Sequence, residues 1–302
     1  GPGYFAMRGS GLKSRINGST VAGSFSVTRP DSRYEQRVGL MLGIDQVEVI
    51  AAKTFVPFKI PQDLSKWLGS GPQGGELSDI TFLYQGQVHV LAGELGRRIE
   101  LVGNMTDASV IYDQAWPEVS ELTGQVHVAG RTTNVQVDTA VSNNLRLVRS
   151  TVRLKDNGAY AVVDLNALSD GQDALDFILA TPLTESLGFV TPNWRAEGAV
   201  GFSGTLRVPI KQDGAPKLAV DFDFDLRDFD VVMPEYRLSL EDLVGNGHFS
   251  LPYSVVGSFS GALFEHPAAF RVTSDNDWIR FDIEGMASHA DVYQLIDYED
   301  IG

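Results

Sequence analysis

The stretch Ala219-Val220-Asp221-Phe222-Asp223-Phe224-Asp225-Leu226 decides the fold class of this chain. Successive side chains of a β-strand point to opposite faces, so an extended backbone places the even-numbered apolar residues on one face and the three aspartates on the other. This stretch therefore predicts a strand with one apolar face and one face turned toward water.

The same alternation recurs along the chain, with turn residues between the alternating segments. It is found in residues 125–128, 134–138, 151–154, 205–210 and 277–283. The sequence Gly-Gln-Val-His-Val also occurs twice, from residue 86 and from residue 124, and looser copies begin at residues 204 and 247. Because these starts are separated by multiples of about 40 residues, they indicate a repeated β unit. We predict an antiparallel all-β protein.

Three segments depart from this strand rhythm. Residues 61–68 place Leu64, Trp67 and Leu68 at helical spacing, which predicts a short helix lying on the sheet. Residues 170–181 predict a second short helix, capped by Asp173 and ended before Pro182. Residues 69–75 are rich in glycine and predict a loop.

The composition excludes several classes of function. The 302 residues carry a formal net charge of -15, which argues against nucleic acid as a partner because the phosphates would be repelled. The absence of cysteine excludes disulfides, thiolate catalysis and cysteine-based zinc sites. Gly1-Pro2-Gly3 resembles the remnant of a cleaved tag, so we expect the chain to be a piece of a longer protein.

Motifs that carry chemistry are weak in this sequence. Residues 69–74 match the glycine fingerprint of dinucleotide-binding proteins, but they contain a proline and follow a predicted helix instead of a parallel strand. The three aspartates at 221, 223 and 225 have the first spacing of a calcium loop, yet Leu226 and Val232 stand where its glycine and glutamate belong. The five histidines show no spacing that favours a metal. We therefore predict no catalytic residues, no metal and no cofactor.

Several strand-and-turn segments occur together in an order that resembles a known family. They are Phe55-Val56-Pro57, Trp67-Leu68, Gly75-Glu76-Leu77, Phe82-Leu83-Tyr84-Gln85-Gly86, Trp116-Pro117-Glu118-Val119, Asp173-Ala174-Leu175-Asp176-Phe177-Ile178, Thr181-Pro182-Leu183, Leu243-Val244-Gly245 and Gly261-Ala262-Leu263-Phe264-Glu265-His266-Pro267. With these segments the chain resembles the AsmA-like family of Gram-negative envelope proteins, most closely its YhdP branch and more distantly TamB. The resemblance spans most of the sequence.

The resemblance implies a fold, a location and a cargo. The implied fold is an elongated, curved antiparallel sheet rolled into an open hydrophobic groove. The implied protein is periplasmic, several times longer than this chain, and held in the inner membrane by an N-terminal helix that this chain lacks. Phospholipid acyl chains would pass along the groove between the inner and outer membranes, without covalent chemistry and with unspecified protein partners at the ends of the bridge.

We expect three successive groove units, over residues 4–100, 101–190 and 191–302. The predicted lining of the groove consists of the inward positions of the alternating strands. They are Val135, Val137, Leu206, Val208, Val220, Phe222, Phe224, Leu226, Ile279, Phe281 and Ile283. Two other architectures fit the alternation: a closed β-sandwich that binds protein or glycan at its rim, and a β-propeller with units of about 40 residues.

Overall fold

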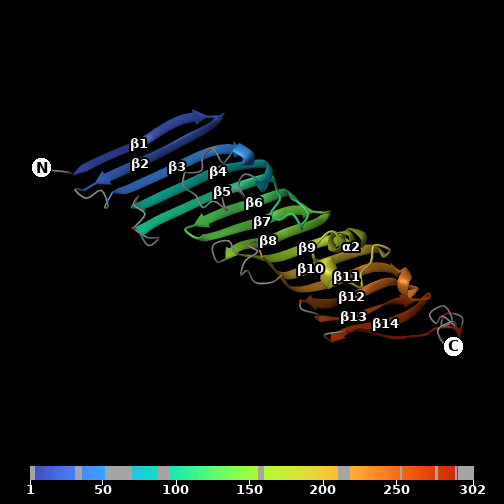
Figure 1. Ribbon diagram of the computed structural model, residues 1–302. Coiled ribbons are helices and arrows are strands. Elements are labelled where there is room, and N and C mark those ends of the chain that lie inside the picture. The colour runs from blue at the N-terminus through green and yellow to red at the C-terminus, as the bar shows by residue number, and fades with distance from the viewer. Residues whose placement is uncertain are drawn as a thin grey trace. The chain divides into compact units, whose positions relative to one another are not determined.

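The computed structural model of the chain describes residues 4–30, 36–51, 70–87, 96–155, 160–209, 218–251, 254–275, 278–289 and 291. In this part the chain is β-structure with the short helices α2 (Gly171–Leu179) and α3 (Leu183–Ser186) and the 3-10 turn η5 (Pro234–Tyr236) (Figure 1). The strands are β1 (Phe5–Ile16), β2 (Ser19–Arg29), β3 (Arg37–Glu48), β4 (Pro72–Gln87), β5 (Arg97–Val110), β6 (Val119–Ala129), β7 (Thr132–Ser142), β8 (Leu145–Lys155), β9 (Tyr160–Asp170), β10 (Arg195–Pro209), β11 (Ala219–Met233), β12 (Leu238–Ser250), β13 (Ser254–Leu263), β14 (His266–Asp275) and β15 (Trp278–Gly285).

These strands form one sheet in which every strand is hydrogen-bonded to its neighbours in the sequence. The order runs from β1 to β15 without a crossover, and the sheet does not close, because β1 and β15 are its two edges. The predicted all-β, open antiparallel fold is confirmed. Over the described residues there is one sheet, whereas a sandwich needs two packed sheets and a propeller needs separate blades.

Contacts divide the chain into two compact units. The first unit comprises Gly1–Tyr112, Ser120–Thr139 and Thr151–Ala159, and the second comprises Asp113–Val119, Ala140–Ser150 and Tyr160–Gly302. These units are defined by contacts in space, whereas the three groove units were expected from repeats in the sequence. That threefold division stays a prediction.

In the second unit, pairing between strands sorts the side chains onto two faces. Residues directly opposite each other in an antiparallel pair lie on the same face of the sheet. Phe224 pairs with Phe202 of β10 and with Gly247 of β12, whereas its neighbour Asp223 pairs with Ser203 and His248. The alternation read from residues 219–226 therefore extends across neighbouring strands as an apolar face and a polar face.

Bulges interrupt β11 and β12 toward one end of these strands in the second unit. One extra residue in β11 shifts its pairing with β10 between Glu197 and Ala199 and its pairing with β12 after Leu226, and β12 has a second bulge after Glu241. Each extra residue lets the apolar side chains beyond the bulge stay on the same face. Gly198, with φ of +96°, is required opposite the β11 bulge because a Cβ there would lie 2.1 Å from the Asp228 carbonyl oxygen.

Helix α2 lies over the apolar face just beyond these bulges. A Cβ at Gly171 would meet the side chains of Phe229 and Ala196, both of which belong to that face. The helix begins at Asp170, whose side chain accepts a hydrogen bond from the Gln172 backbone N–H at 3.1 Å. The predicted helix is therefore confirmed, but its predicted cap was wrong, because Asp173 lies inside the first turn.

The first unit has an apolar face of its own. On this face Val21 pairs directly with Ile44, and Ile44 pairs with Ile80. These three residues form a buried cluster together with Val47. Leu42, Ala51 and Leu77 pack against this cluster.

Residues 70–75 differ from the predicted loop, because β4 already begins at Pro72. Register shifts around Gly74 and the positive φ of Gly75 fit these residues into a bulged strand end. The helix predicted over residues 61–68 lies outside the described residues.

Candidate functional site

The predicted lining residues of the second unit lie on its apolar face. Leu206 pairs directly with Val220, and Phe222 and Leu226 alternate with the aspartates of β11. On the last two strands Val272 pairs with Phe281 and Phe270 pairs with Ile283, which continues the same face to the edge strand β15. The structure thus brings together on one face Leu206, Val208, Val220, Phe222, Phe224, Leu226, Ile279, Phe281 and Ile283.

The two remaining predicted residues, Val135 and Val137, lie on β7 and are assigned to the first unit. The Gln125 side-chain amide donates to the Asn104 side chain at 3.2 Å, so Gln125 shares the polar face of Asn104. Its neighbour Gly124 therefore points to the apolar face, where a Cβ would meet the Val137 Cα at 3.1 Å. Val137 is buried and Val135 partly buried on that face.

Five phenylalanines and four glycines meet on the apolar face of the second unit, and we call this set the Phe–Gly floor. Its members are Phe202, Phe222, Phe224, Phe249, Phe259, Gly204, Gly245, Gly247 and Gly257. The rings lie over the glycines: a Cβ on Gly247 would be 2.4 Å from the Phe224 Cζ, and one on Gly257 would be 2.7 Å from the Phe259 Cζ. The Phe224 and Phe259 rings are stacked, with centroids 6.0 Å apart across β12.

Burial varies across this apolar face. Val208 and Val220 are 4% and 3% exposed, whereas the five rings of the Phe–Gly floor are only partly buried. Phe281 and Ile283 on the edge strand are 50% and 41% exposed. An apolar surface of this kind, still open to solvent, is typical of a site that contacts an apolar partner.

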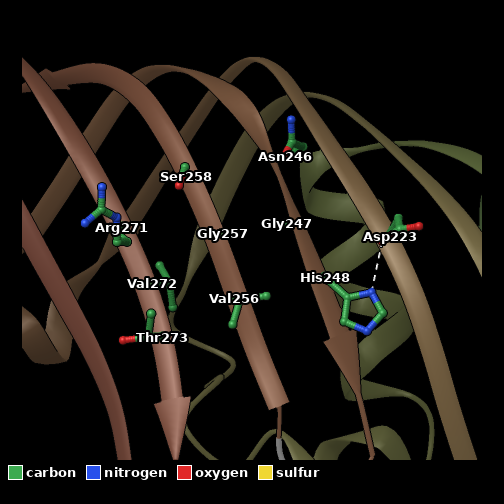
Figure 2. A pocket seen from close by; sticks show the side chains of 10 residues that line it. All are labelled: Asp223, Asn246, Gly247, His248, Val256, Gly257, Ser258, Arg271, Val272 and Thr273. Atoms are coloured by element: carbon green, nitrogen blue, oxygen red, sulfur yellow. Dashed lines mark hydrogen bonds and ion pairs between the residues drawn. The ribbon is translucent and has the colours of Figure 1, made fainter.

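The opposite face of β11–β14 is polar and carries a shallow hollow of about 490 Å³ (Figure 2). Most of the side chains around it belong to polar-face positions, among them Asn246, Ser258 and Arg271. His248 Nδ1 lies 2.9 Å from Asp223 Oδ1, and its Nε2 lies 3.9 Å from Asp221 Oδ1. Both ring nitrogens of His248 thus face carboxylates of β11.

Asp221, Asp223 and Asp225 of β11 project into water. The Asp221 and Asp223 side chains are 74% and 77% exposed, and Asp225 pairs with Arg227 at 2.9 Å. In the described part of the chain, no group of three or more acidic or histidine side chains could hold a metal ion. The aspartates therefore make the polar face of β11 and do not converge on a ligand.

Sequence reasoning missed the buried residues beside α2 at one end of the apolar face. Ala196, Val231, Leu240 and Leu243 lie beyond the bulges and are each 8% exposed or less. Beside them Trp194 packs against Phe189 and Tyr236, with ring centroids 6.1 and 6.3 Å away. The signal in the sequence was a break in the apolar–polar alternation, because Leu226 and Phe229 are three residues apart and not two.

Sequence reasoning also missed the glycines of the Phe–Gly floor. They occupy apolar-face positions of the alternating strands, where a residue without a side chain interrupts the apolar–polar alternation. The register places Gly204, Gly245 and Gly247 next to rings of neighbouring strands, and Gly257 lies beside Phe259 of its own strand.

The fold and the site define a class: open antiparallel sheet proteins in which one face is apolar and only partly covered. Among the described residues, no helix combines the length and the apolar character needed to span a bilayer. A family model described as YhdP protein matches residues 13–298, so the chain belongs to the YhdP family. Neither a curated protein nor a solved structure matches the chain significantly.

Proposed function

We propose that this chain is part of a bridge that carries phospholipid between the inner and outer membranes of Gram-negative bacteria. Acyl chains lie on the apolar face, headgroups stay in water, and no covalent bond changes. The location is the periplasm, where an N-terminal helix holds the full-length protein in the inner membrane. Membership of the YhdP family and the resemblance to AsmA-like envelope proteins support this proposal.

The observation that carries the proposal is the near absence of charge on an exposed face. From β9 to β15, the register positions of the apolar face include one ionisable residue among those described, His266 at the start of β14. Among the described positions of this face, a charged ligand would find His266 as its one ionisable partner. An acyl chain gains about 0.8 kcal/mol for each methylene that it removes from water, so this face favours long hydrocarbon chains.

A packed protein partner fits the face less well than lipid does. Sheets that pack on each other interdigitate their side chains at a spacing of about 10 Å. On the Phe–Gly floor the rings lie over glycines, and α2 already occupies the layer above the neighbouring part of the face. A second sheet therefore cannot lie flush over the whole face, whereas flexible acyl chains can follow it.

The test is to purify the chain from bacteria and to measure bound lipid by native mass spectrometry and by solvent extraction. We expect co-purified phospholipid. A charge placed on the apolar face by Phe222→Asp should lower the lipid content, because the carboxylate holds water where an acyl chain would lie.

The matched control places the same charge on the other side of the sheet. Ser258→Asp lies on the polar face of β13 and should leave the lipid content unchanged. The proposal fails if the purified chain holds no phospholipid and takes up none from vesicles. It also fails if the two folded variants lose lipid equally.

A further inference from the structure

We propose that the lipid path over the second unit is the Phe–Gly floor, and that helix α2 is a fixed wall along one side of it. This inference rests on the proposed function and deepens it, because it assigns the acyl chains to one part of the apolar face. The occupant is the acyl portion of a phospholipid. The covered end of the face, represented by Ala196, Phe229, Val231, Leu240 and Leu243, is excluded from the path.

The glycines of the Phe–Gly floor distinguish its surface from the rest of the face. Gly204, Gly245 and Gly247 leave room for a ring of a neighbouring strand to lie across them, as Phe222 does beside Gly204, and Gly257 leaves room for Phe259 of its own strand. The direct pairs Phe202–Phe224 and Phe222–Phe249 then continue this surface from strand to strand. The result is a low, uncharged surface that crosses four strands, which suits a chain that moves across them.

The column of bulges separates this surface from the covered end. Leu226 lies on the open side of its bulge and Phe229 on the side of α2. The Gln172 side-chain oxygen accepts a hydrogen bond from the Ala196 backbone N–H at 3.2 Å, which joins the start of α2 to β10. The Asn144 side-chain amide donates to Asp173 at 2.9 Å, which joins the same turn of α2 to the loop between β7 and β8.

Three phenylalanines provide a size-matched test of the path. Phe222 and Phe249 belong to the Phe–Gly floor, whereas Phe229 lies on the same face and on the same strand as Phe222 but beyond the bulge. Each would be replaced singly by the photoreactive residue p-benzoylphenylalanine. The 302-residue chain would be incubated with vesicles of phosphatidylethanolamine and phosphatidylglycerol, irradiated and analysed by mass spectrometry.

We expect phospholipid adducts at Phe222 and Phe249, and at Phe229 only crosslinks within the protein. Adducts of similar yield at all three positions would overturn the assigned path while leaving the proposed function intact. Adducts at none of them, together with no bound lipid in the unsubstituted chain, would instead overturn the proposed function. Circular dichroism would confirm that each variant keeps its β-structure.

A second experiment tests whether α2 is fixed. The chain has no cysteine, so Asn144→Cys with Asp173→Cys introduces the only thiols, and a short thiol-specific reagent can bridge them. A fixed wall predicts that the bridged protein takes up phospholipid from the same vesicles as fast as the two single variants do. Uptake that is lost on bridging and regained on reductive cleavage would show that α2 must move, and would overturn the fixed wall.

Discussion

Paired substitutions at Phe224 provide a quantitative test of whether its face is open to water. Phe224 is partly buried and stacks on Phe259. Phe224→Ala removes roughly 100 Å² of apolar contact, which at about 25 cal/mol per Å² lowers the free energy of unfolding by about 2.5 kcal/mol. Phe224→Asp loses the same contact, but its carboxylate can stay in water. We therefore expect the two variants to differ by no more than about 1 kcal/mol, the range of strand propensities.

Val231 is the matched position in the covered end of the same strand and is 8% exposed. Val231→Ala should cost about 1.5–3 kcal/mol from lost burial. Val231→Asp should cost several kcal/mol more than Val231→Ala, because an unpaired carboxylate is then taken out of water. The difference between aspartate and alanine at each position therefore reports how well water reaches it, independently of the contacts that both substitutions remove.

The assay is urea unfolding of all four variants, followed by tryptophan fluorescence and circular dichroism. The reasoning is refuted if Phe224→Asp is several kcal/mol less stable than Phe224→Ala, since Phe224 would then lie in a closed core. A small difference at Val231 would refute the assignment of a covered end. Variants that remain folded would also be assayed for bound phospholipid, which should fall in Phe224→Asp.

Four further predictions follow from single residues. Gly257→Ala should lower bound phospholipid while the fold persists, because the new Cβ would be 2.7 Å from the Phe259 ring and must lift it; lipid extraction checks this. Gly198→Ala should destabilise the chain by about 2 kcal/mol or more in urea unfolding, since its φ is positive and the Cβ meets backbone. Asp170→Ala should cost about 1 kcal/mol by the same assay, because α2 loses its N-cap. Hydrogen bonds from the side chains of Thr191 and Asn193 hold the pKa of Glu235 below the usual 4.5. The ionised Glu235 should therefore contribute to stability above pH 4.5, and this contribution should be lost as the pH falls through the lowered pKa. An NMR titration of the Glu235 carboxyl carbon measures the pKa.

The alternation in the sequence was sufficient to predict the strands and the faces of the sheet. Residues 219–226 lie in β11 with their apolar and acidic side chains on opposite faces, as the period of two requires. The segments at residues 125–128, 134–138 and 151–154 lie in β6, β7 and β8. This worked because the period of a strand depends on the backbone alone, and each strand separates apolar from polar residues in the same way.

Features that depend on pairing between strands could not be predicted in this way. The bulge at Asp228 exists because β10 contributes Gly198 opposite it, and neither sequence segment shows the other. Asp170 and Asp173 are both good capping residues, and the choice between them is made where β9 ends, at Asp170. The loop predicted over residues 69–75 failed for a similar reason, because pairing with β5 extends β4 through its glycines.

An open apolar face is an aggregation hazard, and the same alternation that builds it also limits that hazard. On β11, Val220, Phe222, Phe224 and Leu226 are each followed by a charged residue on the other face, and the acidic ones add to the net charge of -15, whose repulsion keeps molecules apart. On the edge strand β1, Arg8, Lys13 and Arg15 occupy polar-face positions, and charged side chains on an edge hinder pairing with another sheet. Replacing the polar residues of the alternating pattern would therefore lower solubility, even where the apolar face stayed unchanged. The alternating pattern is thus constrained on both of its faces, by contact with an apolar ligand on one and by solubility on the other.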